Sequence, residues 1–226
     1  MKYNEFANVI THARMNRYLT ASGNDSRKAM TLYRKNLRLT QELFTVISCF
    51  EIALRNAIDY KCTLKFGDNW LRDGVKKGGI FDNSNCYLTK QSINEALKKL
   101  HSYSHFKLVA ELGFGFWRYM FAAHQYNATS KILLQIFPSK PKSSATLQYN
   151  NTYDFNELAK LNSLRNRMAH HEPICFQAGL AIKDTTYARQ HHNLILQLFQ
   201  LMQIDEAALL YGLDHIYSIC NEIDSL

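Results

Sequence analysis

Proline and glycine are scarce in this chain of 226 residues, which contains three prolines and nine glycines. Because both residues interrupt regular structure, their scarcity favours helices joined by few turns. No apolar stretch approaches the roughly 20 residues that a membrane-spanning helix needs. No apolar run follows the first residues, as one would in a secretory signal. The sequence therefore predicts a cytoplasmic protein without a membrane segment.

The five cysteines are odd in number and widely spaced, and no two of them form a Cys-x-x-Cys pair. This pattern argues against a disulfide framework and against a structural zinc site. The paired histidines His170–His171 and His191–His192 are not part of a Glu-x-x-His frame, and neighbouring side chains on a helix point in different directions. We expect reduced, mostly buried thiols, no metal site and no other cofactor.

Basic residues exceed acidic ones, so the formal net charge is +8 and the isoelectric point is near 9.2. A basic balance of this kind suits a polyanionic partner such as nucleic acid. Hydrophobic residues make up 46% of the chain, which is enough for a substantial core. A length of 226 residues is consistent with one domain, and we expect that domain to span residues 1–226.

Apolar residues recur at steps of three and four along most of the chain, which is the period of a helix. Two segments, at about 67–88 and 138–152, carry turn residues instead and are predicted to be irregular. The second is basic, so it is either a plain connector or a flap that holds a nucleic-acid strand. The pattern predicts an all-α bundle. We expect two helices at about 25–36 and 39–66, or one continuous helix over both, and one or two short helices over 205–224. The other predicted helices lie at about 3–21, 89–102, 105–112, 113–126, 130–137, 154–171 and 184–203.

The segment from Leu161 to Pro173 is the most informative about function. The helix that contains this segment starts upstream, where Asp154 is a good N-cap and Glu157 completes the spacing of a capping box. Pro173 disfavours helical backbone at the preceding residue, so the helix should end near residue 171. The apolar face of this helix would consist of Phe155, Leu158, Leu161, Leu164 and Met168.

Three polar residues on this predicted helix form a cluster suited to phosphate chemistry. Asn166 and His170 are four residues apart and share one face. Arg165 falls within the apolar arc, where a guanidinium needs either a carboxylate partner or a bound anion. Its fork of donors matches phosphate, and an imidazole transfers protons near neutral pH. Without a carboxylate pair or a metal cage, the cluster indicates phosphodiester chemistry on RNA.

The pattern Arg165-Asn166-x-x-x-His170 resembles the signature of the HEPN-superfamily ribonucleases. The longer run from Leu164 to Pro173 is similar to the Abi (abortive infection) family, AbiD/AbiF type. Two further segments, Phe50–Ile58 and Val109–Trp117, resemble the N-terminal helix and the glycine–aromatic block of that family, in the same order. The resemblance implies an HEPN-like helical bundle and a role in phage defence by abortive infection.

The resemblance also implies a metal-independent endoribonuclease whose site is shared between the two chains of a homodimer. His170 would act as general base or acid, Arg165 would bind the scissile phosphate, and Asn166 would orient the phosphate or the histidine. The ribose 2′-hydroxyl would be the nucleophile, so the product would be a 2′,3′-cyclic phosphate. His171 also has an allowed spacing from Arg165 and could exchange roles with His170.

Three more charged residues are accessory candidates. Arg167 lies beside the site, either as a contact to flanking phosphate or as an exposed helix arginine. Glu51 and Arg55 are four residues apart on one predicted helix. They either form an intrahelical ion pair or line the same site, where Glu51 would orient Arg165 or Arg55.

Two alternatives to an enzyme are open from the sequence. One is a non-catalytic RNA-binding or regulatory protein, in which the same cluster holds a structured RNA without cutting it. The other is a purely structural cluster, with Arg165 in a buried network and His170 near the negative end of the helix dipole. A neutralising RNA or protein is a further candidate partner, which the sequence does not identify.

Overall fold

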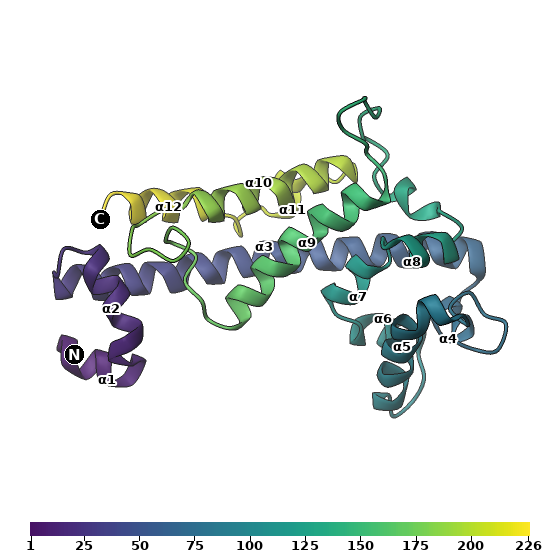
Figure 1. Cartoon of the computed structure of the whole chain (residues 1–226), viewed down its shortest axis with the longest axis horizontal. Helices are drawn as coiled ribbons and strands as arrows, with labels where there is room; N and C mark the ends of the chain where they lie inside the picture. The colour runs from purple at the N-terminus through teal and green to yellow at the C-terminus, as the bar shows by residue number, and fades with distance from the viewer. The chain divides into compact units, whose positions relative to one another are not determined.

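The computed structural model describes all residues, 1–226, and the protein is all-α, as the sequence predicts. One isolated antiparallel bridge joins Phe176 to Lys183. None of the helices combines the length and the apolar character needed to span a bilayer. The chain forms α-helices α1 to α12, which are labelled in Figure 1, and two short 3-10 helices, η1 and η2. In chain order these elements are α1 (Tyr3–Ile10), α2 (His12–Ala21), α3 (Ser26–Phe66), α4 (Trp70–Gly74), η1 (Ser84–Cys86), α5 (Tyr87–Lys99), α6 (His105–Glu111), α7 (Phe114–Tyr119), α8 (Ala123–Ala128), η2 (Ile132–Ile136), α9 (Asn151–Ala169), α10 (Thr186–Leu201), α11 (Glu206–Leu209) and α12 (Ile216–Asp224).

The chain divides into two compact units. Unit 1 contains residues 1–48, 163–197 and 205–226, and unit 2 contains residues 49–162 and 198–204. The helices α3, α9 and α10 each contribute residues to both units. The single domain predicted over residues 1–226 stays a prediction.

Unit 1 begins with two short helices where the sequence predicts a single one over residues 3–21. Thr11 has a backbone φ of 87°, which ends α1, and its hydroxyl accepts the amide hydrogen of Arg14 at 3.3 Å, which begins α2. A positive φ is unusual for a β-branched residue, and apolar periodicity does not reveal it. The predicted single helix is therefore wrong. The two helices pack against each other, and their aromatic residues join a row of ring contacts formed by Phe6, Tyr33, Tyr18 and Phe176.

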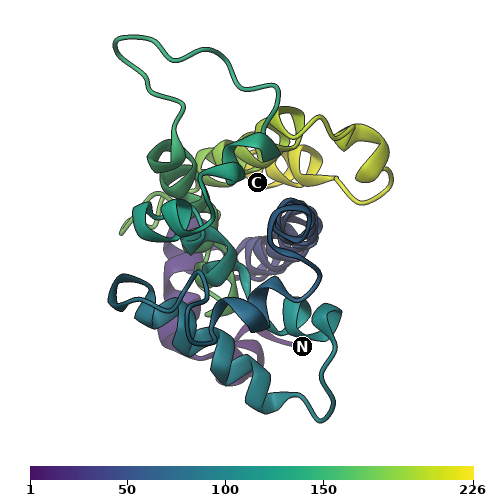
Figure 2. The ribbon, with the colours of Figure 1, turned by 90° about the vertical axis from the view of Figure 1, so that its right-hand side faces the viewer.

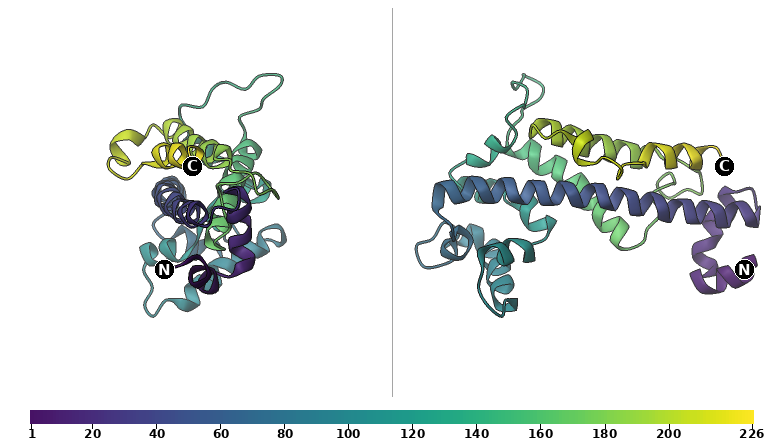
Figure 3. Two further views of the ribbon diagram at one scale, coloured as in Figure 1. Left: turned by 90° about the vertical axis from the view of Figure 1, so that its left-hand side faces the viewer. Right: turned by 180° about the vertical axis from the view of Figure 1, so that it is seen from behind.

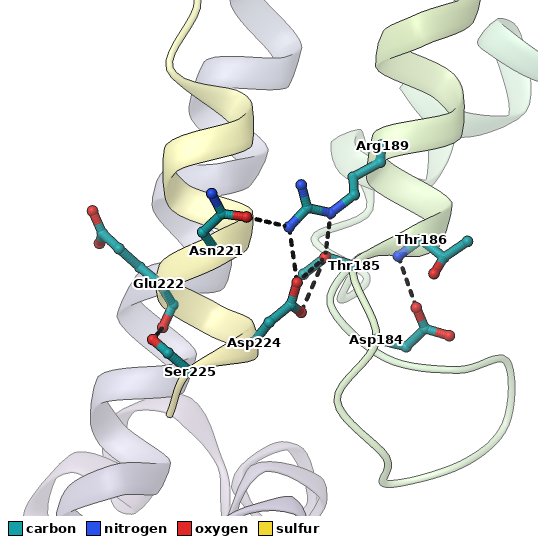
Figure 4. A network of polar contacts seen from close by, with 8 residues as sticks. All are labelled: Asp184, Thr185, Thr186, Arg189, Asn221, Glu222, Asp224 and Ser225. Atoms are coloured by element: carbon teal, nitrogen blue, oxygen red, sulfur yellow. Dashed lines mark hydrogen bonds and ion pairs between the residues drawn. The ribbon is translucent and has the colours of Figure 1, made fainter.

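A polar network joins the start of α10 to α12 within unit 1 (Figure 4). Arg189 on α10 forms an ion pair with Asp224 and donates a hydrogen bond to the side-chain oxygen of Asn221, both at 2.8 Å. The hydroxyl of Thr185 donates to Asp224 at 2.8 Å and accepts a hydrogen bond from Nε of Arg189 at 3.0 Å. These contacts fix the C-terminal helix to the segment that follows the motif.

Unit 2 packs the second half of α3 with α4 to α8, and α4, α5 and α6 contact one another (Figure 2). The segment predicted to be irregular at 67–88 is irregular only in part, because it contains α4 and η1. Gly79 lets the chain turn tightly there, since a Cβ atom at this position would overlap the carbonyl oxygen of Asp73. The largest fully buried side chains of this core are Phe50, Trp70, Phe81, Phe114, Trp117, Phe121, Phe137 and Phe199.

The N-terminus of α9 differs from the predicted capping box. Asn150 is the N-cap, because its side-chain oxygen accepts the amide hydrogens of Thr152 at 3.0 Å and of Tyr153 at 3.1 Å. Asp154 lies within the first turn instead, where it is fully buried and pairs with Lys140. The prediction of Asp154 as N-cap is therefore wrong. The helix also begins three residues earlier than expected, at Asn151 rather than Asp154.

Lys140 lies in the loop that precedes α9. This loop projects from unit 2 in Figures 2 and 3. The rest of the loop is largely exposed, but the Lys140 side chain is only 9% exposed. Its ammonium lies 4.8 Å from the centre of the Phe137 ring and 5.8 Å from that of Tyr153. Burial raises the pKa of the Asp154 carboxyl to about 6, against the opposing effect of the Lys140 charge. The base of the loop is therefore anchored by a buried ion pair.

Replacing Lys140 with methionine should lower the free energy of unfolding by about 3 kcal/mol at pH 8, because it leaves the Asp154 carboxylate buried without a partner. A carboxyl whose pKa is raised in the folded state contributes most to stability below its unfolded pKa of 3.8, and this contribution is lost as pH rises through about 6. The loss of stability caused by the substitution should therefore be much smaller at pH 5 than at pH 8. Urea unfolding followed by circular dichroism at both pH values measures this difference. Lys142→Met, at an exposed position in the same loop, is the control. Equal losses at both pH values for Lys140→Met would contradict this assignment.

Candidate functional site

The C-terminus of α9 ends in a closed turn formed by the motif residues. His171 has a backbone φ of 56°, in the left-handed region. Its amide donates to the carbonyl of Met168 at 2.9 Å, and the amide of Glu172 donates to the carbonyl of Arg167 at 3.0 Å. This pair of hydrogen bonds is a Schellman motif with His171 in the position that glycine usually takes. The helix consequently ends at Ala169, close to the predicted end.

Arg167 holds the chain that leaves this turn. Its guanidinium donates to the carbonyl of Pro173 at 2.6 Å, and its Nε lies 3.6 Å from a carboxylate oxygen of Glu172. The same guanidinium lies 4.9 Å from the centre of the Tyr187 ring. Arg167 is half-buried rather than fully exposed. Its contacts stabilise the turn that positions the neighbouring histidines.

The segment after Pro173 is attached to α3 and α2 within unit 1. The amide of Ile174 donates to the side-chain oxygen of Asn36, a buried residue on α3, at 3.0 Å. Arg17 on α2 donates to the carbonyls of Gln177 at 2.7 Å and of Leu180 at 2.9 Å. These contacts attach the segment that follows the turn to α2 and α3.

Asn166 and His170 are both exposed and lie one helical turn apart. The amide of His170 donates to the carbonyl of Asn166 at 3.0 Å, which places both residues on the same face of the helix end. His171 is exposed too, but its left-handed backbone turns it out of the helical path. The structure therefore keeps Asn166 and His170 together and separates His171 from that face.

The helical wheel places Arg165 within the apolar arc of α9, but the structure buries this residue only in part. Leu164 and Met168 beside it are buried, whereas Arg165 is half-buried. Its Nε atom is inaccessible to solvent and has no hydrogen-bond partner. A buried donor without a partner costs about 1–3 kcal/mol. An acceptor supplied by a bound anion would remove this cost.

This arrangement brings a guanidinium donor, an amide and a solvent-exposed imidazole together at one helix end. The carbonyls of Arg167 and Met168, which would repel an anion, are already occupied by the Schellman hydrogen bonds. The nearby thiol of Cys175 is buried, and burial raises its pKa to about 12. Cys175 is therefore neutral and unsuited to nucleophilic attack. The polar groups left at this helix end are the exposed side chains of Asn166 and His170 and the half-buried guanidinium of Arg165.

The family model for Abi-like proteins matches residues 2–175. The chain belongs to the Abi-like family. The match includes all of α1 to α9 and the turn that ends α9, whereas α10, α11 and α12 lie beyond it. No curated protein and no solved structure gives a significant match. Membership in this family supports a role in abortive-infection defence.

Two accessory candidates of this Abi-like protein, Glu51 and Arg55, belong to unit 2, whereas the motif residues belong to unit 1. Both are half-buried on α3. Arg55 lines a cavity within unit 2, and its Nε atom is buried without a hydrogen-bond partner. Their contribution to the motif site stays a prediction.

The second histidine pair of the Abi-like protein is engaged by other groups. His191 contacts the carbonyl of Tyr187 at 2.8 Å through Nδ1, and His192, which is buried, lies 2.6 Å from Asp214 through Nε2. No group of three or more histidine, cysteine, aspartate or glutamate side chains is arranged to hold a metal ion. All five cysteines are free, and the predicted burial is confirmed for Cys62, Cys86, Cys175 and Cys220.

His171→Gly should stabilise the Abi-like protein by roughly 0.5–1 kcal/mol, because glycine adopts a left-handed backbone without the steric cost that other residues incur. Ala169→Gly, two residues earlier and still in the helix, should destabilise the protein by a similar amount. Chemical denaturation of both variants measures the two effects. Changes of the same sign would show that the helix does not end as described.

Proposed function

We propose that this Abi-like protein is an endoribonuclease of the HEPN, AbiD/AbiF type that cleaves RNA without a metal ion. The observation that carries the proposal is the exposed pair Asn166 and His170, one turn apart, beside Arg165 with its buried and unpaired Nε. A solvent-exposed imidazole transfers protons, and an unpaired guanidinium donor favours an anionic ligand. The net charge of +8 also favours RNA as the substrate.

In the proposed reaction the ribose 2′-oxygen attacks the adjacent phosphorus. One His170 imidazole removes the proton of the 2′-hydroxyl, and a protonated His170 gives a proton to the 5′-oxygen that leaves. The new bond joins the 2′-oxygen to phosphorus, and the bond between phosphorus and the 5′-oxygen breaks, so the products are a 2′,3′-cyclic phosphate and a 5′-hydroxyl. Arg165 stabilises the charge that develops on the phosphate, and Asn166 orients the phosphate or the imidazole.

Two proton-transfer groups are needed, and each chain supplies one convincing motif. A homodimer with a twofold axis would place two copies of Arg165 and His170 at one composite site. This arrangement provides a base and an acid from the same residue type. In a cell, such a nuclease would act in the cytoplasm against host or phage RNA, under the control of a neutralising RNA or protein.

The experiment that tests this function incubates the wild-type protein with mixed cellular RNA in the presence of EDTA. We expect cleavage products that end in a 2′,3′-cyclic phosphate, because the mechanism uses the 2′-hydroxyl and no metal. Size-exclusion chromatography with light scattering should show a dimer. Tight RNA binding without cleavage would favour the second candidate, a non-catalytic RNA-binding protein, which the same positive charge supports.

A further inference from the structure

Unit 2 contains a cavity of about 640 Å³ that none of the motif residues lines. It lies between the second half of α3, which contributes Arg55, Asp59 and Tyr60, and the start of α6, which contributes His105 and Phe106. Cavities of roughly 300–1,000 Å³ are typical of sites for small organic ligands. The size therefore suits one ring system with its substituents.

Asp59 fixes the polar wall of this cavity. One of its carboxylate oxygens lies 2.7 Å from Nε1 of Trp70 and 2.6 Å from Nε2 of His105. An ionised carboxylate only accepts hydrogen bonds, so Nε2 of His105 carries the proton. In the neutral imidazole Nδ1 is then an acceptor, and this atom is buried without a partner.

Arg55 provides the complementary group on the same cavity. Its Nε–H is a donor, and it is also buried without a hydrogen-bond partner. Buried polar atoms without partners are rare in native proteins, and two residues with such atoms line this one cavity. Arg55 and His105 both line the cavity, and each carries one buried polar atom without a partner: a donor on Arg55 and, when the imidazole is neutral, an acceptor on His105. A ligand with an acceptor and a donor on one edge would satisfy both.

The remaining feature is aromatic. Phe106 is 80% exposed and Tyr60 is 62% exposed, although both line the cavity. Exposed aromatic rings beside a polar cavity are typical of surfaces on which flat rings stack. The carboxylates of Asp59 and Asp68 on the cavity wall disfavour an isolated phosphate as the main ligand. The geometry therefore favours an uncharged, flat, heteroaromatic group.

We infer that this cavity binds a nucleobase. Every nucleobase carries hydrogen-bond donors and acceptors along one edge and has faces that stack on aromatic rings. The base could belong to single-stranded RNA, in which case the inference rests on the proposed function and adds a base-selective contact to it. The same chemistry would recognise a free nucleotide, in which case the site is independent of cleavage.

The test uses titration calorimetry with the four 5′-nucleoside monophosphates and with four single-stranded RNA homo-oligomers. The full-length His170→Ala protein is used so that no RNA is consumed. We expect saturable binding of at least one probe, weakened about tenfold or more by Phe106→Ala, because one stacking contact is lost. Arg55→Met should weaken binding of the same probe. Tyr211→Ala, at an aromatic residue of unit 1 that is 89% exposed, is the matched control and should bind as the parent does.

Binding of a mononucleotide identifies a nucleotide site, and binding of oligomers alone identifies a base of RNA. Absence of saturable binding by any probe would overturn the inference, and so would binding that Phe106→Ala and Arg55→Met leave unchanged. Phe106 is exposed, so its variant should keep the circular dichroism spectrum and melting temperature of the parent. Failure of wild-type protein to cut RNA is scored in the separate cleavage assay and would reject the proposed function without affecting nucleotide binding.

Discussion

Replacing His170 with alanine should lower the rate of RNA cleavage by about 10²- to 10⁴-fold, because the variant lacks the imidazole that we propose as the proton-transfer group. In the proposed dimer one substitution removes both the proposed base and the proposed acid, so we expect an effect near the upper end of this range. The measurement is single-turnover cleavage of a labelled RNA, with the enzyme in excess. His170 is exposed, and the hydrogen bond from its backbone amide to the carbonyl of Asn166 does not involve the imidazole. The variant should therefore retain the wild-type melting temperature.

His171→Gly is the matched control for this experiment, because it removes the neighbouring imidazole at a position where glycine suits the backbone. We expect it to cut RNA within a few-fold of the wild-type rate. The opposite result, with His171→Gly inactive and His170→Ala active, would assign proton transfer to His171. Wild-type rates for both single variants and for the double variant would remove histidine from the mechanism.

The periodic features of the fold could be predicted from the sequence because each depends on neighbours within one helix. Leu158, Leu161, Leu164 and Met168 are buried as their spacing predicts, and α9 ends close to the expected residue. The same spacing placed Arg165 within the apolar arc, where the structure shows it half-buried rather than fully buried. These features follow from about 100° of rotation per residue, so no tertiary contact is needed to predict them.

Features that depend on distant residues could not be predicted in this way. Asp154 has the sequence context of an N-cap, yet Lys140, which lies 14 residues away in the chain, holds it in the buried interior. The positive backbone φ at Thr11 and His171 occurs at residues other than glycine, so composition gave no signal. Two partners of Arg189, Asn221 and Asp224, are 32 and 35 residues distant in the chain. Local pattern cannot identify such contacts.

Arg165 and Arg167 illustrate how two neighbouring arginines on one helix acquire different roles. The guanidinium of Arg167 has a carbonyl, a carboxylate and an aromatic ring as partners, all from residues that follow the helix. Nε is buried without a hydrogen-bond partner in both arginines, but Nε of Arg167 lies 3.6 Å from the Glu172 carboxylate, whereas Arg165 forms no ion pair. Arg167 therefore contributes to the stability of the turn. Arg165 retains an unsatisfied donor, which is costly in the free protein and useful when an anion binds.

Replacing Arg165 with methionine should consequently affect activity and stability in opposite directions. Cleavage should fall by about 10³-fold, because the charge that develops on the phosphate loses its principal donor. The free energy of unfolding should stay unchanged or rise by about 1 kcal/mol, because a buried donor without a partner is replaced by an apolar side chain of similar length. Arg165→Lys should recover little activity, since an ammonium keeps the charge but lacks the planar fork that binds two phosphate oxygens.

Arg167→Met, two residues away, is the matched control and should show the reverse pattern. Its loss of contacts to Pro173, Glu172 and Tyr187 should lower the melting temperature, while the chemical step in the remaining folded protein changes little. Cleavage by Arg165→Met at the wild-type rate would refute its role at the phosphate. A loss of about 3 kcal/mol or more in stability for Arg165→Met would instead identify Arg165 as a member of a buried structural network, because only the removal of a paired buried charge is that costly.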